Sequence, residues 1–289
     1  MRSLIPALFF ATITVFTGCS TAQYGVGYGN LANQVSRQKG LVAFWDFRDT
    51  SGHPAAGSAK EVKLNAYGPA RFVKEGPFSG WAMELDGKGY WSIEHKNSGM
   101  LDIKNNAVTI IAWVKWNGGT GFVAGKWNEY SDGGKRQYGL FVSLPYYNGE
   151  DQVCGHISKN GGPTAPFPFS IDYSASPQKV PVNEWVCVAF TYDGNYIRSY
   201  LKGVFEERKP ELVMHTAGFL EDHPQGLTQI KNPYRYPDGM GNNGSDFTIG
   251  AVQLKGGMGN FFKGKIGGVA VFNRALDDKE MKQLAVMPQ

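Results

Sequence analysis

The sequence predicts an all-β fold in which two antiparallel sheets pack face to face, followed by a short C-terminal helix. Three observations support this: a hairpin pattern over residues 185–203, a strand-to-helix block over residues 262–276, and a composition with 38 glycines and 13% aromatic residues. Glycine suits tight turns between short strands, and aromatic residues are favoured on pleated surfaces. The 29 Lys and Arg nearly balance the 25 Asp and Glu, so the charge does not favour nucleic acid as a partner.

Alternation of apolar and polar residues predicts strands at residues 185–192 and 196–203. Strand-like segments also lie at residues 122–130, 135–143, 152–158 and 262–272. The strands at 185–192 and 196–203 flank an Asp-Gly-Asn turn, which is typical of a β-hairpin. Trp185 is expected to be a core ring between the two sheets. Asp277 and Glu280 have the spacing of a capping box, which predicts the start of the final helix.

Residues spread over this pattern resemble the laminin-G-like jelly rolls of the concanavalin A-like lectin and glucanase superfamily. The matching positions are Trp185, Thr191 to Gly194, Gly203, Phe262, Gly264, Ile266 and Asn273 to Leu276. Upstream, residues 40–47 look like the family's opening strand, residues 85–93 like its next hairpin and residues 108–114 like its long central strand. The resemblance implies a two-sheet antiparallel jelly-roll sandwich over residues 40–289. It leaves activity open, because this fold hosts lectins, hydrolases, lyases and interaction modules.

The N-terminus indicates export and lipid anchoring. Residues 4–16 form an apolar stretch too short to span a bilayer, and Phe16-Thr17-Gly18-Cys19 resembles a bacterial lipobox. The resemblance implies that residues 1–19 are a lipoprotein signal peptide and that Cys19 is acylated. Residues 20–39, rich in Gly, Gln, Asn and Ser, are then expected to act as a flexible tether. An ordinary signal peptide with a chance cysteine is the alternative.

Cys154 and Cys187 remain once Cys19 is assigned. In an exported protein they are either a disulfide or two buried thiols, and the sequence leaves both open. Their spacing forms no Cys-x-x-Cys motif, and no histidine pair has zinc spacing, so no transition-metal site is expected.

Calcium is the one ion for which the sequence offers oxygen ligands. Related sandwiches hold it with carboxylates of the closing strand, where this chain has Gly267 and Gly268 instead. Asp46, Asp49 or the loop Asn242–Asp246 remain as candidate ligands, but the same residues are common in ordinary turns. The expectation is therefore no cofactor, with calcium as the alternative.

The candidate site lies in the middle of the chain. If the segments at 122–130, 135–143 and 152–158 are neighbouring strands, five polar or aromatic side chains share one face of the concave sheet. These are Trp127, Glu129, Arg136, Tyr138 and His156. Long Pro-containing loops at 161–169 and 232–246 are expected to wall a cleft beside them.

This set of side chains suits carbohydrate chemistry. An aromatic ring provides a platform for a sugar ring, Arg donates to a carboxylate or sulfate, and Glu and His bond hydroxyl groups. The same parts permit a polysaccharide lyase, with His156 and Tyr138 transferring protons and Arg136 neutralising a carboxylate. The compact Gln-x-His motif of similar alginate lyases is absent, however. So is the paired-carboxylate motif of laminarinase-like hydrolases. A purely architectural role is the third alternative, with Arg136 and Glu129 as a structural ion pair.

The sequence thus predicts a carbohydrate-binding lipoprotein of the bacterial cell envelope, periplasmic or surface-facing. A polysaccharide lyase or other sugar-active enzyme is the first alternative, and a structural or protein-binding envelope module is the second. The expected partners are a glycan and, through a lipid anchor, the membrane.

Overall fold

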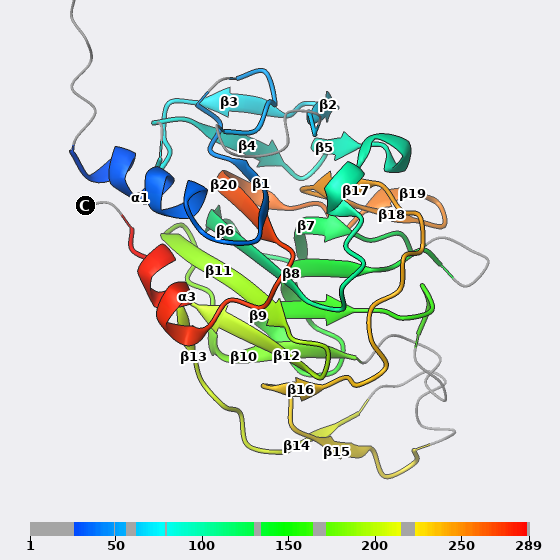
Figure 1. The fold of residues 1–289 in the computed structure, drawn as a ribbon. Coiled ribbons are helices and arrows are strands. Elements are labelled where there is room, and N and C mark those ends of the chain that lie inside the picture. Colours follow the sequence, from blue (N-terminus) through cyan, green and yellow to red (C-terminus); the bar gives the residue numbers. More distant parts are fainter. Residues whose placement is uncertain are drawn as a thin grey trace, which may run out of the picture.

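The computed structural model describes residues 26–48, 50–55, 62–78, 80–129, 134–163, 172–214 and 223–287. In these residues two large antiparallel sheets pack face to face, and helices α1 and α3 lie outside one of them (Figure 1). The predicted jelly-roll sandwich with a short C-terminal helix is confirmed.

The larger sheet has nine strands among the described residues. Its main order is β13-β12-β11-β6-β20-β4-β3, with β1 paired to β20 and β16 paired to β12. The bounds are β1 Leu41–Trp45, β3 Arg71–Val73, β4 Ala82–Asp86, β6 Val108–Trp116, β11 Trp185–Tyr192, β12 Tyr196–Leu201, β13 Val204–Phe205, β16 Tyr234–Arg235 and β20 Lys263–Phe272.

The second sheet has seven strands among the described residues, in the order β10-β9-β8-β7-β17-β5-β2. The bounds are β2 Asn65–Tyr67, β5 Tyr90–Ile93, β7 Gly121–Lys126, β8 Tyr138–Leu144, β9 Gly149–Ile157, β10 Tyr173–Lys179 and β17 Phe247–Ile249. Two hairpins stand apart from both sheets: β14 Glu211–Val213 with β15 Leu227–Gln229, and β18 Val252–Leu254 with β19 Gly257–Gly259. Two single 3₁₀ turns, η1 His95–Asn97 and η2 Gly99–Leu101, follow β5.

The hairpin predicted at residues 185–203 is present as β11 and β12. The strands pair from Val188↔Leu201 to Tyr192↔Ile197. The Asp193 side chain stabilises the turn, because its Oδ1 accepts the backbone N–H groups of Asn195 at 2.9 Å and Tyr196 at 2.7 Å. This is the local geometry that Asp and Gly favour in turns.

The predicted capping box at the last helix is also present. Helix α3 (Asp278–Leu284) begins after Asp277, whose carboxylate accepts the N–H of Glu280, while the Glu280 side chain accepts the N–H of Asp277. Arg274 clamps the same Glu280 with two hydrogen bonds of 2.7 Å. The Arg274 guanidinium also lowers the pKa of Glu280.

Three apolar layers hold the fold together. The first lies between the sheets, where for example the Trp45 ring stacks on Phe247 of the opposite sheet with centroids 5.3 Å apart. The second covers the outer face of the nine-stranded sheet beneath α1 and α3, around Trp113. The third covers part of the outer face of the seven-stranded sheet beneath the two hairpins, around Phe141.

Helix α1 (Val26–Ser36) lies in the interval predicted as a flexible tether. Leu31, Ala32 and Val35 are buried in the second apolar layer, so this part of residues 20–39 belongs to the folded domain. Burial of these three side chains outweighs the high content of small and polar residues, which had favoured flexibility.

Trp185 differs from its predicted position. Val186, Val188 and Phe190 of β11 face the inter-sheet core, whereas Cys187 and Ala189 face outward. Because side chains alternate along a strand, Trp185 shares the outward face, and it is only partly buried. It is therefore not a core ring between the sheets.

The two cysteines are free and buried. Cys187 lies on the outer face of the nine-stranded sheet and Cys154 on the outer face of the seven-stranded sheet. The whole inter-sheet core separates them, so the thiol alternative holds and the disulfide does not form. Burial raises the pKa of the Cys154 thiol to about 12.

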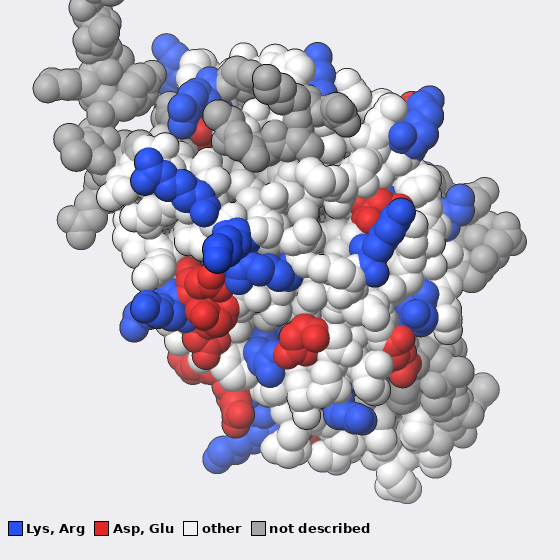
Figure 2. Space-filling view, viewed as in Figure 1, with Lys and Arg blue, Asp and Glu red and all other residues white. Residues whose placement is uncertain are grey.

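Charged side chains of both signs are intermixed over the face of the molecule shown in Figure 2. Among the described residues, no helix has the length and apolar character needed to cross a bilayer.

Candidate functional site

The structure separates Tyr138 from the other predicted site residues. Tyr138 pairs with Ile157, and its ring lies in the inter-sheet core, where its hydroxyl donates to the carbonyl of Leu101 at 2.6 Å. His156 pairs with Gly139 and faces the opposite side of the sheet. The predicted grouping of Tyr138 with His156 is therefore wrong, and the lyase arrangement that requires both side chains at one substrate is not formed.

The remaining four predicted residues lie together on the outer face of the seven-stranded sheet. Trp127 follows β7, and its Nε1 donates to Glu129 Oε1 at 3.2 Å. The Arg136 guanidinium lies 5.6 Å from the centroid of the Trp127 ring and 3.9 Å from Glu129 Oε1. The His156 ring packs against Trp127 with centroids 4.3 Å apart.

Asp172 completes this cluster, although the sequence analysis did not include it. Its Oδ1 lies 3.6 Å from His156 Nε2. Burial lowers the pKa of His156, while Asp172 acts in the opposite direction. Burial also lowers the pKa of Arg136. Trp127 is 1% exposed and His156 4% exposed, so these two rings are packed into the fold.

An open groove lies beside this cluster on the same face of the sheet. Its volume is about 370 Å³, and Trp127 forms part of its wall. The other lining residues come from β2, β5, β17, the β18–β19 hairpin and adjoining segments: Tyr67, Tyr90, Ser92, Glu94, Asn128, Lys135, Asp246, Thr248, Gln253 and Met258. Apart from Trp127, none of these residues was among the predicted carbohydrate-binding residues. Asp246 had been named only as a candidate calcium ligand and as the end of the loop 232–246 expected to wall the cleft.

Two tyrosines form an aromatic platform at one end of the groove. Tyr67 and Tyr90 are cross-strand neighbours of β2 and β5, and their rings stack with centroids 5.0 Å apart and an interplanar angle of 7°. Tyr67 is 41% exposed and Tyr90 is partly buried. Burial raises the pKa of Tyr90, with Tyr67 and Asp246 adding to the effect, so its hydroxyl stays protonated as a donor at neutral pH.

Polar side chains of the groove are held by the backbone around them. Asp246 Oδ1 accepts the N–H of His95 at 2.7 Å, Thr248 Oγ1 donates to the carbonyl of Ala251 at 2.6 Å, and Gln253 Nε2 donates to the carbonyl of Leu254 at 3.1 Å. Glu94 forms an ion pair of 2.7 Å with Lys96 at the rim. Oriented donors and acceptors beside an apolar ring face are the parts that fix a polyhydroxylated ligand.

Two of the candidate calcium ligands, Asp46 and Asp246, have protein partners. Asp46 forms a 2.9 Å ion pair with Arg48 and also accepts its N–H, while Asp246 bonds His95 as above. Asp49 lies outside the described residues. Among the described residues, no group of three or more His, Cys, Asp or Glu side chains is placed to hold a metal ion.

The predicted signal peptide with Cys19 lies outside the described residues. Residues 164–169 of the first predicted loop also lie outside them. The second predicted loop, 232–246, is described, and Pro233, Tyr234 and Arg235 line a separate pocket at the sheet edge.

A family model described as the concanavalin A-like lectin/glucanases superfamily matches residues 72–217, which is half of the chain. Among solved structures, domain 4 of AbnA, a GH43 extracellular arabinanase from Geobacillus stearothermophilus in complex with arabinotriose, aligns with a TM-score of 0.54 and 16% identity. That alignment covers 85% of this chain and 98% of that domain. A comparison with curated proteins finds no significant match.

The binding domain of botulinum neurotoxin DC in complex with SialylT aligns with a TM-score of 0.52 and 12% identity, over 85% of this chain and 51% of that one. The binding domain of botulinum neurotoxin serotype C1 aligns with a TM-score of 0.50 and 9% identity, over 86% and 52%. The chain therefore spans about half the length of these toxin domains. At such identities the similarity establishes a shared fold.

Proposed function

This chain belongs to the concanavalin A-like lectin/glucanases superfamily, and on that premise we propose that it is a carbohydrate-binding module of the bacterial cell envelope. Its ligand is a glycan that lies in the groove on the outer face of the seven-stranded sheet. Attachment to the membrane through Cys19 is part of the proposal and rests on the sequence of residues 1–19.

The stacked pair of Tyr67 and Tyr90 is the observation that carries the proposal. A 41% exposed ring beside oriented polar side chains exposes apolar area that a sugar ring can cover. Tyrosine combines such a ring with a hydroxyl that hydrogen-bonds at the edge of the contact. Structures with the same fold support this class of ligand, since one is in complex with arabinotriose and another with SialylT.

The first prediction tests the platform. Replacement of an aromatic contact removes burial worth about 1.5–3 kcal/mol, so Tyr67→Ala and Tyr90→Ala should each weaken glycan binding about tenfold or more. The measurement is affinity electrophoresis of the purified protein against neutral and acidic polysaccharides, followed by calorimetry with the best binder.

Tyr146→Ala is the matched control, because Tyr146 is 61% exposed and does not line the groove. The control should bind as the parent does. Retention of full affinity by both groove variants would place the glycan elsewhere, and failure of the parent to bind any polysaccharide in a broad panel would count against the carbohydrate-binding proposal. Monitoring the same mixtures for an unsaturated, ultraviolet-absorbing product also tests for lyase activity.

A further inference from the structure

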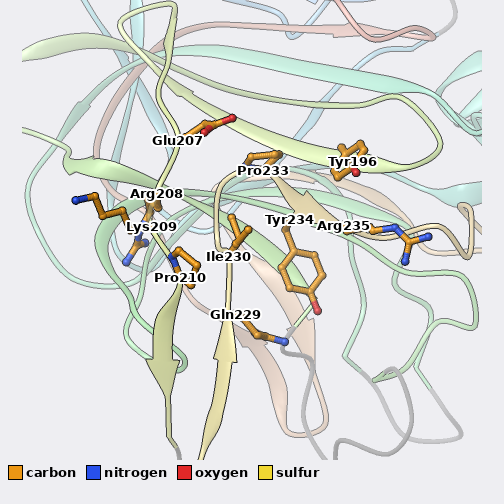
Figure 3. A pocket seen from close by; sticks show the side chains of 10 residues that line it. All are labelled: Tyr196, Glu207, Arg208, Lys209, Pro210, Gln229, Ile230, Pro233, Tyr234 and Arg235. Atoms are coloured by element: carbon orange, nitrogen blue, oxygen red, sulfur yellow. The ribbon is translucent and has the colours of Figure 1, made fainter.

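A second and larger cavity lies at the edge of the sandwich, well away from the groove. Its volume is about 960 Å³, and it lies between residues 207–210, which follow β13, and residues 229–235, which run from β15 into β16 (Figure 3). Strand β12 contributes Tyr196. In Figure 1, β16 and the β14–β15 hairpin lie at the bottom of the molecule, whereas β2 and β5 of the groove lie at the top.

The walls of this edge pocket are tied together by Asn232, whose side chain is fully buried. Its Oδ1 accepts the N–H of Ser199 at 2.9 Å, and its Nδ2 donates to the carbonyls of Ser199 at 3.1 Å and Glu206 at 2.8 Å. The N–H of Arg208 in turn donates to the carbonyl of Asn232 at 2.9 Å. The wall that contains Asn232 is therefore hydrogen-bonded to β12 through Ser199, and it is hydrogen-bonded to the opposite wall through Glu206 and Arg208.

Arg208 belongs to the wall rather than to the ligand surface. Its Nε donates to Glu211 Oε1 at 2.9 Å, its Nη2 pairs with Glu211 Oε2, and its Nη1 donates to Gln152 Oε1 at 2.9 Å. These bonds satisfy the guanidinium within the protein. Its charge is balanced by Glu211.

Two other cations border the cavity and are exposed to solvent. Lys209 and Arg235 lie at opposite ends of the pocket in Figure 3, and the exposed carboxylate of Glu207 lies at its upper edge. With Arg208 balanced by Glu211, the lining charges that remain are two positive and one negative. Arg235 is the cross-strand neighbour of Tyr196, which places a planar, anion-binding donor next to an aromatic ring.

Beside these charges the cavity offers apolar area. Ile230 is 49% exposed, and Pro233 and Tyr234 continue the same surface. The Gln229 side chain hydrogen-bonds the Tyr234 hydroxyl. The exposed side of this surface is therefore formed by Ile230 and by the ring of Tyr234.

We propose that the edge pocket is a second saccharide site, specific for an acidic sugar unit. Its carboxylate or sulfate pairs with Arg235, and its ring covers Ile230 and Tyr234. The proposal rests on the proposed carbohydrate function only for the class of ligand, because the pocket and the groove share no residue. Two sites on one module increase the affinity for a polymer through effective concentration.

The test is a ¹⁵N nuclear magnetic resonance titration of the purified protein with D-glucuronate, glucose 6-sulfate, D-glucose and inorganic sulfate. We expect saturable shifts of the Tyr234 and Arg235 amides with at least one of the two acidic sugars, and at least tenfold weaker binding of glucose and of sulfate alone. Arg235→Gln removes a charged hydrogen bond and should weaken the acidic sugar about tenfold or more. Glu207→Gln removes a negative charge that repels the acidic sugar, so it should strengthen binding of that sugar.

Arg37→Gln is the matched control, because it removes an exposed arginine beside α1 and α3. It should leave the titration unchanged, as should Tyr67→Ala, which affects only the groove. Equal binding of glucose and the acidic sugars, shifts confined to groove amides, or no shift with any of the four would each overturn the proposal. Sulfate binding as tightly as glucose 6-sulfate would show a bare anion site and also overturn it. None of these results decides whether the groove binds a glycan. That proposal is tested separately by Tyr67→Ala and Tyr90→Ala.

Discussion

Lys231 is fully buried. It lies against Tyr173, which belongs to the third apolar layer, and Tyr234, which lines the edge pocket. Its Nζ lies 3.6 Å from the centroid of the Tyr173 ring and 5.1 Å from that of Tyr234. Burial lowers the pKa of Lys231 to about 7, although Cys154 and Asp172 oppose the shift. The aromatic faces offset part of the cost of burying the charge.

This pKa predicts a pH dependence of stability. In the unfolded chain the lysine titrates near 10.5, so between pH 7 and about 10.5 the unfolded state binds a proton that the folded state lacks. The free energy of unfolding should therefore rise with pH in this window, by up to about 1.4 kcal/mol per pH unit. Denaturant unfolding of the parent and Lys231→Met at pH 7, 8 and 9 measures it.

The difference between parent and Lys231→Met isolates this residue from other groups that titrate in the same range. Exposed Lys104→Met is the control and should keep the parent's slope. If Lys231→Met has that slope too, the ammonium is not desolvated in the folded protein as described.

For single residues, alternation could predict which side chains of one strand share a face. It could not predict which face of a neighbouring strand lies on the same side of the sheet. In Tyr90-Trp91-Ser92-Ile93, the inward Trp91 and Ile93 already require Tyr90 and Ser92 to face the groove, so this part of the site was available from the sequence. Tyr138 and His156 are different, because their facing depends on the pairing of β8 with β9. A one-residue change of register moves every side chain to the other face, and no residue pattern specified that register.

Helix α1 shows a similar limit at the level of elements. Its sequence contains Gly, Gln and Asn, and its apolar residues become informative only when the outer face of the nine-stranded sheet is known to be there. Isolated helices of this length are marginal in water. Packing against the sheet therefore determines whether α1 forms, whereas the capping box of α3 is a local signal that the sequence carries by itself.

The packing of α1 is tested by a core substitution within it. Leu31 is 5% exposed and lies in the second apolar layer. Leu31→Ala should lower the free energy of unfolding by about 2–5 kcal/mol, since it removes buried carbons and leaves a cavity. Thermal or denaturant unfolding measures the change.

Asn33→Ala is the control on the same helix, because Asn33 is exposed, and it should change stability by less than about 0.5 kcal/mol. Equal, small effects of both substitutions would mean that residues 26–36 behave as the flexible tether first expected.

For the whole molecule, the family pattern predicted the sandwich because its strands, turns and last helix agree with one another along the chain. It could not predict which surface is accessible, since that depends on the hairpins β14–β15 and β18–β19, which cover part of the outer face of the seven-stranded sheet. The structure also places the N-terminal helix on the nine-stranded sheet, opposite the groove. If the proposed anchor at Cys19 is present, it precedes α1 and lies on the side of the domain opposite the groove.

Cys19 lies close to helix α1 in the sequence. Seven residue steps separate Cys19 from Val26, where α1 begins, and a chain of that length spans at most about 25 Å in any conformation. A lipid on Cys19 would thus hold the domain near the bilayer.

Because acyl chains contribute about 0.8 kcal/mol per buried CH₂, Cys19→Ala should move the protein from the membrane pellet to the soluble fraction or leave it as an unprocessed precursor. Ser20→Ala should stay in the pellet, and a Cys19→Ala protein that is processed and sediments like the parent would show that Cys19 carries no anchor.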